Sequence, residues 1–212
     1  MEENRFNQII KSDSFALISD FVEISLDSLA KDDIIKDIPM IGTISKLLSI
    51  GNTINDRLFT KKLFHFLKEL ENINQDLILK EIQYIDDSKE YNQKVGEKLF
   101  EIITRIDSDE KPKIIGRLFR NFIDKKISYL VFLKLTNIVE KAFYHDLNLL
   151  CECDSEGKFY VNLDNDLYSL GLITHTGIGE FDFTDEEREE FNKITHLLSK
   201  KGKILLEYGL KS

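Results

Sequence analysis

The chain has 212 residues, of which 42% are hydrophobic and 32% are charged, so most of it is expected to fold around a packed core. Only 2 prolines and 10 glycines, among many Leu, Ile, Lys and Glu residues, favour helices and argue against an all-β protein. The two cysteines form a Cys151-Glu-Cys153 triplet, which excludes a disulfide scaffold and indicates a reducing compartment. The net charge of -9 weighs against a dedicated nucleic-acid binder.

The first half of the chain carries helical spacing in three successive segments. Apolar residues recur at three- and four-residue steps from 14 to 30. The segment 38–54 begins with a proline suited to a first helical turn and is then apolar nearly all round, which is typical of a buried helix. Residues 54–70 predict an amphipathic helix. Its apolar side comprises Leu58, Phe59, Leu63, Phe66, Leu67 and Leu70, and its polar side carries Arg57, Lys61, Lys62 and Lys68.

Further helices are predicted up to residue 150. Two of them span 74–85 and 90–106, the second with a capping box formed by Asp87 and Glu90. Another spans 111–124, where a proline is tolerated in the first turn. A long, strongly apolar helical pattern follows from 127 to 150.

The residue pattern changes after Cys153, where helical spacing gives way to glycine-containing turns and short alternating segments. A turn at 154–157 precedes a short alternating segment at 159–163, which predicts a strand. The segments 167–173, 171–183 and 197–206 are typical of the helix, the wing and the closing helix of a winged-helix module.

One stretch of this tail has two conflicting interpretations. Thr184 and Glu187 have the spacing of a capping box, which predicts a helix reaching about Ser199. That helix and the closing helix from 197 do not both fit residues 184–200, and the sequence leaves the choice open.

Several segments resemble known families. Residues 38–46, 54–67, 96–107 and 113–123 resemble a widespread family of uncharacterised bacterial helical proteins. The tail patterns Leu170-Gly-Leu-Ile173 and Leu198-Ser-Lys-Lys-Gly202 resemble the end of the Abi-alpha abortive-infection family. The resemblance implies a small intracellular bacterial or phage-borne protein with a role in the contest between phage and host. It implies no catalytic residue, because that family offers no catalytic motif to carry over.

No motif in the sequence predicts an enzyme, a metal or a cofactor. Cys151 and Cys153 lack the second ligand pair of a structural zinc site. Gly177-Ile-Gly179 lacks the register of a dinucleotide-binding loop. The four histidines, His65, His145, His175 and His196, are scattered outside any catalytic signature.

We therefore predict a mainly α protein, with an N-terminal multi-helix bundle over 1–150 and a small α+β, winged-helix-like tail over 151–212. The N-terminus lacks a secretory signal, and no stretch reaches the ~18 uncharged apolar residues of a spanning helix, so we expect a cytoplasmic protein, at most peripheral to the inner membrane face.

For function, we expect a non-enzymatic interaction protein of phage defence, acting through protein contacts, with itself included among the partners. Charge segregation selects Arg57, Lys61, Lys62 and Lys68 as an exposed basic face for this role. One alternative is a membrane-active effector that uses the hairpin 38–70 after a trigger, and burial of Ile41, Ile44, Leu47, Leu48 and Ile50 would discriminate against it. Another is a nucleic-acid-binding regulator acting through the tail, which the acidic charge of that tail ranks last.

Overall fold

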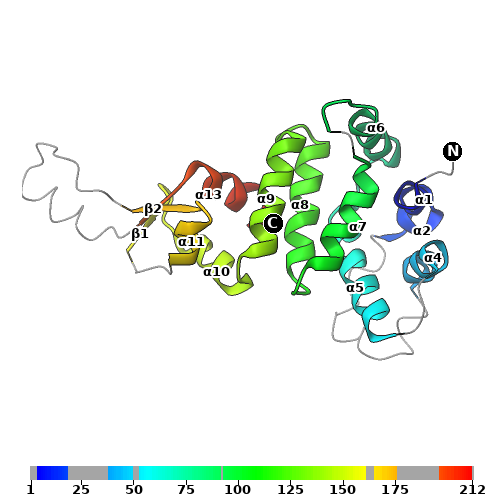
Figure 1. The fold of residues 1–212 in the computed structure, drawn as a ribbon, viewed down its shortest axis with the longest axis horizontal. Coiled ribbons are helices and arrows are strands. Elements are labelled where there is room, and N and C mark those ends of the chain that lie inside the picture. The colour runs from blue at the N-terminus through cyan, green and yellow to red at the C-terminus, as the bar shows by residue number, and fades with distance from the viewer. Residues whose placement is uncertain are drawn as a thin grey trace, which may run out of the picture. The chain divides into compact units, whose positions relative to one another are not determined.

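A computed structural model describes residues 4–18, 38–49, 53–91, 93–160, 165–175 and 196–211. The fold is mainly α-helical with a small sheet near the C-terminus, which confirms the predicted class of a mainly α protein with an α+β tail (Figure 1). Its contacts divide the chain into two compact units, Met1–Tyr129 and Leu130–Ser212. The domain boundary at residue 150, which we infer from composition, stays a prediction.

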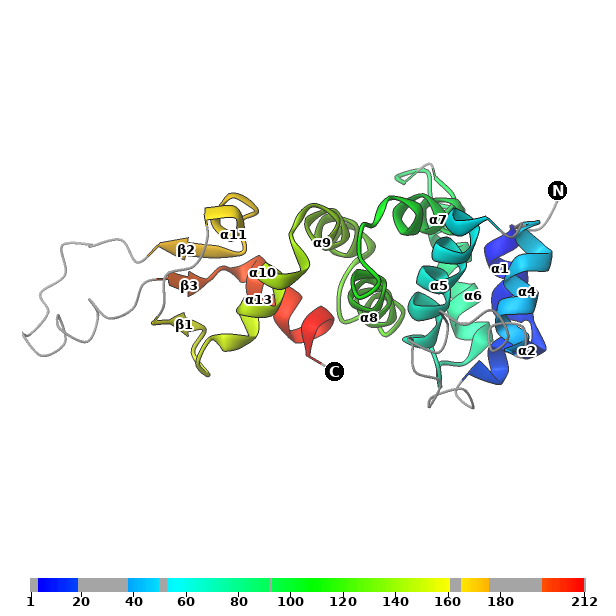
Figure 2. The ribbon, with the colours of Figure 1, turned by 90° about the horizontal axis from the view of Figure 1, so that it is seen from below.

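In unit 1, the described residues form helices. They are α1 (Arg5–Lys11), α2 (Asp13–Ala16), α4 (Pro39–Leu48), α5 (Ile54–Lys68), α6 (Gln75–Asp86), α7 (Val95–Arg105) and α8 (Lys111–Ile123). Helix α5 lies between α4 and α8 (Figure 2). Its contact with α8 is the most extensive between any two elements that the structure describes.

Three buried phenylalanines join α1, α5 and α8 through the centre of unit 1. The ring centroids of Phe6 and Phe66 are 6.2 Å apart, and those of Phe66 and Phe119 are 5.6 Å apart. Each of these rings is almost completely buried. Because aromatic pairs at such distances stabilise a core beyond their buried area, this line of rings fixes α5 at the centre of the unit.

Helices α5 and α8 approach each other closely at Gly116. A Cβ atom on this residue would lie 2.7 Å from the carbonyl oxygen of Phe66 and 2.7 Å from the Cβ of Glu69. Around this point, Arg117 Nε donates to Glu69 Oε2 at 3.1 Å, and Arg120 Nη1 donates to the Glu69 carbonyl oxygen at 3.0 Å. The second bond satisfies a carbonyl group at the C-terminal end of α5 that has no partner within the helix.

The structure corrects two predicted helices in the N-terminal half. Helix α2 ends at Ala16, and most of the helix predicted over 14–30 lies outside the described residues. Helix α4 stops at Leu48 instead of continuing to residue 54, because Ser49 adopts the left-handed conformation, with φ of 53°, and ends the helix.

The helices predicted after residue 70 are confirmed at α6 and α8, but the start of α7 is corrected. The capping box of Asp87 and Glu90 is wrong, because Asp87 ends α6 and α7 begins only at Val95. The backbone N–H of Val95 donates to Asp86 Oδ1 at 2.8 Å. A carboxylate at the end of one helix thus satisfies a donor in the first turn of the next.

Unit 2 combines short helices with a three-stranded antiparallel sheet. Helix α9 (Tyr129–Lys141) begins at the last residue of unit 1. It is followed by α10 (Tyr144–Leu149), a 3-10 turn (Leu150–Glu152), β1 (Lys158–Phe159), α11 (Asn165–Ser169), β2 (Ile173–His175), β3 (His196–Leu198), α13 (Lys200–Leu205) and a π turn (Leu206–Leu210). The strand order is β1-β3-β2, with Phe159 opposite His196 and Ile173 opposite Leu198.

The long helix predicted over 127–150 is wrong, because the chain forms α9 and α10 there. The break lies at Ala142 and Phe143, where Phe143 has an extended backbone and a largely exposed ring. No proline or glycine marks this position in the sequence.

The predictions for the tail are partly corrected. The predicted strand over 159–163 is reduced to β1, and residues 161–164 lie outside the described residues. A helix reaching Ser199 is wrong, because residues 196–198 form β3. Ser199 is instead the N-cap of α13, and its hydroxyl oxygen accepts the N–H of Gly202 at 3.0 Å. Residues 176–195 lie outside the described residues, and the winged-helix likeness stays a prediction.

The contact at Gly116 yields a test of packing. We expect Gly116→Ala to lower the free energy of unfolding by about 1–3 kcal/mol, because the added methyl group meets backbone at 2.7 Å. Gly42→Ala in α4 is the matched control, since nothing lies within 4 Å of its Cβ position; there alanine is expected to raise stability by about 0.5–1 kcal/mol. Urea unfolding of both variants measures the difference, and equal effects would contradict this account of the α5–α8 contact.

Candidate interaction surface

The structure places the predicted basic face of α5 largely against the loop between α7 and α8. Lys61 Nζ donates to Asp109 Oδ2 at 2.7 Å, and the Lys61 side chain is only 24% exposed. Lys62 Nζ donates to the carbonyl oxygen of Ile106, at the C-terminal end of α7. A cation is favourable at this position because helix C-termini carry partial negative charge. These two lysines therefore hold the loop of their own chain.

His65 completes the same contact from the next turn of α5. Its ring is 2% exposed, and Nδ1 lies 2.8 Å from the Asp109 carbonyl oxygen. Because a carbonyl oxygen only accepts, the proton is assigned to Nδ1, and the buried Nε2 has no hydrogen-bond partner among the residues that the structure describes. Burial lowers the pKa of His65 from its ordinary value of 6.5, against the opposing effect of the bond to Asp109. The ring is thus neutral in the folded protein.

The loop itself is also held by ion pairs to α8. Lys111 Nζ donates to Asp107 Oδ1 at 2.6 Å, although the lysine is 1% exposed and the aspartate is largely exposed. This hydrogen bond lowers the pKa of Asp107. Lys113 Nζ donates to Glu110 Oε2 at 2.6 Å. The acidic loop 107–110 thus accepts cations from both α5 and α8.

Arg57 and Lys68 are the remaining members of the predicted basic face. Arg57 is exposed in the first turns of α5, whereas Lys68 is half-buried at the end of that helix. The predicted face is therefore not one exposed surface, because only Arg57 of its four residues is classed as exposed. The acids of loop 107–110 are a sequence signal that could have indicated this, since their charge complements that of α5.

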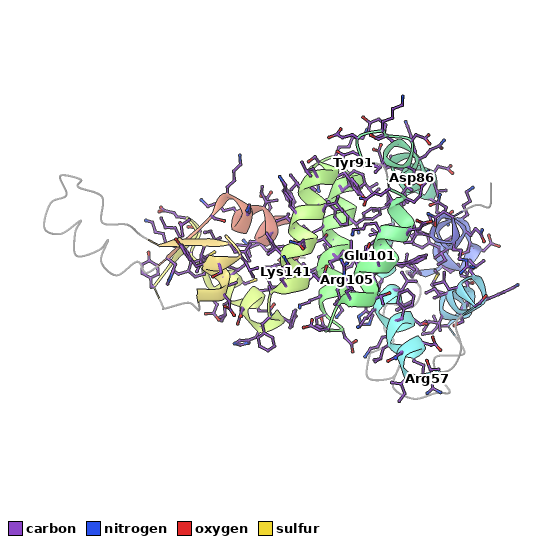
Figure 3. The ribbon with its side chains drawn as sticks, in the orientation of Figure 1. Arg57, Asp86, Tyr91, Glu101, Arg105 and Lys141 are labelled. Atoms are coloured by element: carbon purple, nitrogen blue, oxygen red, sulfur yellow. The ribbon has the colours of Figure 1, made fainter. Side chains whose placement is uncertain are left out.

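The N-terminal end of α5 exposes apolar side chains that the sequence assigned to the buried side or left unassigned. Ile54 is 77% exposed and Leu58, four residues later on the same face, is 43% exposed. Arg57 lies between them in sequence, at the outer end of α5 and away from Glu101 and Arg105 on α7 (Figure 3). We call Ile54, Arg57 and Leu58 the α5 tip.

The α5 tip is rigidly mounted. Thr53 Oγ1 accepts the N–H of Asp56 at 3.2 Å, and Asp56 Oδ2 accepts the N–H of Thr53 at 3.1 Å, which forms a complete capping box. Five residues beyond Leu58, the segment from Leu63 to Leu67 is buried in the core. The tip is therefore an ordered extension of a core helix, with two aliphatic side chains presented to solvent.

Helix α4 bears on the membrane alternative. Ile41 and Ile44 are buried, Leu47 and Leu48 are half-buried, and Ile50 lies outside the described residues. Among the described helices, none combines the length and the apolar character needed to cross a membrane.

The remaining candidate side chains do not converge. Within the described ranges, no group of three or more His, Cys, Asp and Glu residues has an arrangement that could hold a metal ion. Burial raises the pKa of Cys151 and Cys153, which disfavours the reactive thiolate form. His145 is exposed and its ring centroid lies 6.5 Å from that of Phe143.

Comparison with known proteins finds no matching family model, no matching curated protein and no matching solved structure.

The buried imidazole gives a pH-dependent test. Folding lowers the pKa of His65, so below about pH 6.5 the unfolded chain binds a proton more readily than the folded chain does. The free energy of unfolding therefore decreases as the pH is lowered through this range. His65→Asn keeps an N–H donor for Asp109 but does not titrate. Between pH 7.5 and 5.5, the free energy of unfolding measured with urea should fall further for the wild type than for the variant, by at most about 1.4 kcal/mol. The same loss in both proteins would show that His65 is not the titrating group.

Proposed function

We propose that this protein is a non-enzymatic interaction protein that binds another protein through the α5 tip. The observation that supports the proposal is the exposure of Ile54 and Leu58 on one rigid helical face. Full burial of an Ile or Leu side chain contributes about 1.5–3 kcal/mol, so covering these two residues is a substantial driving force for binding. Arg57 adds a residue type that is enriched at energetically important interface positions.

The chemistry of the tip defines the partner it fits. Ile54 and Leu58 call for an apolar surface on the partner, because their exposed aliphatic side chains gain free energy when they are removed from water. Lys61 and Lys62 are engaged with loop 106–109, so they are not part of this contact. The proposal therefore differs from the four-residue basic face that charge segregation predicts.

Site-specific photocrosslinking in cells tests the proposal. A photoreactive residue at position 54 is expected to give one discrete adduct with another protein or with a second copy of this chain. The same residue at position 84 is the control, because Tyr84 is 72% exposed on α6, outside the tip. No adduct from position 54, or the same adducts from both positions, would overturn the proposal.

The aliphatic part of the tip has a matched pair of variants. Leu58→Ser is expected to weaken binding to the crosslinked partner at least tenfold, which corresponds to about 1.4 kcal/mol. Leu77→Ser on α6 removes a leucine of similar exposure, 38% against 43%, and should leave the affinity unchanged. Titration calorimetry with the purified partner measures both, and equal losses would contradict a role for the tip.

We place this interaction in phage defence of the abortive-infection type, a setting that rests on the resemblance to Abi-alpha proteins. Cells that produce the protein are then expected to resist phage infection, and Leu58→Ser should reduce the resistance while Leu77→Ser retains it. Phage plating with matched protein levels gives this comparison. If Leu58→Ser leaves the resistance unchanged, the phage resistance does not depend on the α5 tip, which contradicts this part of the proposal.

A further inference from the structure

The α5 tip is the exposed end of a longer stripe, which we call the α5 stripe and which comprises Ile54, Leu58, Lys61 and His65. Its members are separated by four, three and four positions, and these spacings return to one face of an α-helix. The loop before α8 contacts this face where Asp109 binds Lys61 and His65. The loop therefore covers the later part of a face whose first part, at the tip, is exposed to solvent.

The polar contacts between loop 107–110 and the α5 stripe are made by Asp109. Its carboxylate accepts from Lys61 Nζ at 2.7 Å, and its carbonyl oxygen accepts from His65 Nδ1 at 2.8 Å. No residue of 107–110 is classed as buried, and the side chains of Lys61 and Asp109 are 24% and 38% exposed. An ion pair this accessible contributes little stability, and a segment with few buried side chains opens at lower cost than a core. We therefore expect the loop to detach without unfolding of α5.

His65 makes this contact sensitive to pH. Its ring is almost completely buried, and Nε2 has no hydrogen-bond partner within the described ranges. Nε2 is an acceptor while the ring is neutral, and it becomes a donor when the ring takes up a second proton. A buried donor without an acceptor, in a ring that now carries a positive charge, is costly in free energy. Protonation therefore favours a state in which the ring reaches water.

The charged groups around the His65 ring do not remove this cost. They are Asp109 and Glu110 of the loop and Lys113 of α8. The Asp109 carboxylate is already bound to Lys61. The Glu110 carboxylate is already bound to Lys113, at 2.6 Å. Burial, together with repulsion from Lys113, lowers the pKa of His65 against the bond to the Asp109 carbonyl oxygen and the attraction of the two carboxylates. The closed loop therefore favours the neutral ring.

We propose that loop 107–110 is an acid-released cover of the α5 stripe, which detaches when His65 takes up a second proton. Detachment breaks both Asp109 contacts and exposes Lys61 and His65 to solvent. The exposed face then extends about two helical turns beyond Leu58, and the residues added to it carry positive charge. A partner with carboxylates beside its apolar surface would therefore bind more tightly at acidic pH. This consequence for binding rests on the proposed function of the α5 tip, whereas the detachment does not.

Solvent access to the His65 ring in the wild-type protein tests the detachment. An NMR titration of the proton on Cε1 gives the pKa of His65, and the His65→Asn variant identifies its signal. A neutral gadolinium chelate then reports exposure, because it speeds the relaxation of protons that it approaches. Below the measured pKa, this effect on the His65 proton should rise several-fold over its value at pH 7.5, towards that of the exposed His145. The methyl groups of Leu67, which is completely buried, should stay protected. A charged His65 ring that stays shielded would overturn the proposal, and so would exposure of Leu67 together with the ring.

Asp109→Asn gives a second test, because a closed loop and a detaching loop predict opposite shifts. If the loop stays closed, loss of the Asp109 charge, which favours the protonated ring, lowers the pKa of His65 further. If the loop detaches on protonation, loss of the ion pair to Lys61 makes detachment easier and raises the pKa of His65 towards 6.5. We expect the raised pKa. An unchanged or lowered pKa in this variant would overturn the proposal.

Glu97→Gln is the matched control, because it removes the same charge from an exposed position of α7. It should leave the pKa of His65 unchanged, and an equal rise in both variants would overturn the proposal by showing a general effect of net charge. Circular dichroism confirms that each variant is folded, and the measurement on the wild type needs no variant to carry the loop test. None of these experiments uses a partner, so their failure leaves the α5 tip untouched. Absence of a crosslink from position 54 would instead overturn the proposed function.

Discussion

The close approach of α5 and α8 at Gly116 is the contact on which the rest of unit 1 depends. Any side chain on this residue meets the backbone of α5, so the helices reach this distance only with glycine here. The approach lets the Phe66 ring lie between Phe6 and Phe119, and it brings Arg120 to the last carbonyl groups of α5. Gly116 thus allows both the packing of the aromatic core and the hydrogen bond from Arg120 to the C-terminal end of α5.

The same contact decides what the charges of α5 do. With α8 close to α5, the loop that precedes α8 lies within reach of Lys61, Lys62 and His65. Lys61 therefore binds the Asp109 carboxylate, and Lys62 and His65 bind the backbone carbonyl oxygens of Ile106 and Asp109. The part of α5 that extends beyond the core is its first turns, where Ile54 and Leu58 are exposed. The proposed binding surface and the stabilising contacts accordingly lie at different ends of one helix.

Periodicity predicted most helices of unit 1 because an amphipathic stripe is a local signal. The sequence indicated α5, α6 and α8 within a few residues of their ends, and it indicated the helical start of α4. It did not indicate the end of α4 at Ser49 or the break at Phe143, because neither carries a proline or glycine. The α+β character of the tail followed from its glycines and alternation, whereas the assignment of 196–198 to β3 depends on pairing with two distant strands.

The candidate surfaces were harder to predict than the fold. Which face of α5 is exposed depends on where α8 and its loop lie, which the pattern of one helix does not contain. Charge segregation therefore selected Lys61 and Lys62 as a partner surface, although they bind Asp109 and Ile106 of their own chain.

Native-state hydrogen exchange tests the central role of the α5–α8 contact most directly. If this contact organises unit 1, the amides of α5 and α8 that flank Phe66 and Gly116 exchange only through global unfolding of the unit, and their opening free energies are equal to each other and to its stability. Amides at the ends of α6 and α7 are expected to open at lower cost. Exchange of the central amides of α5 or α8 through smaller openings than those of α6 and α7 would contradict the account.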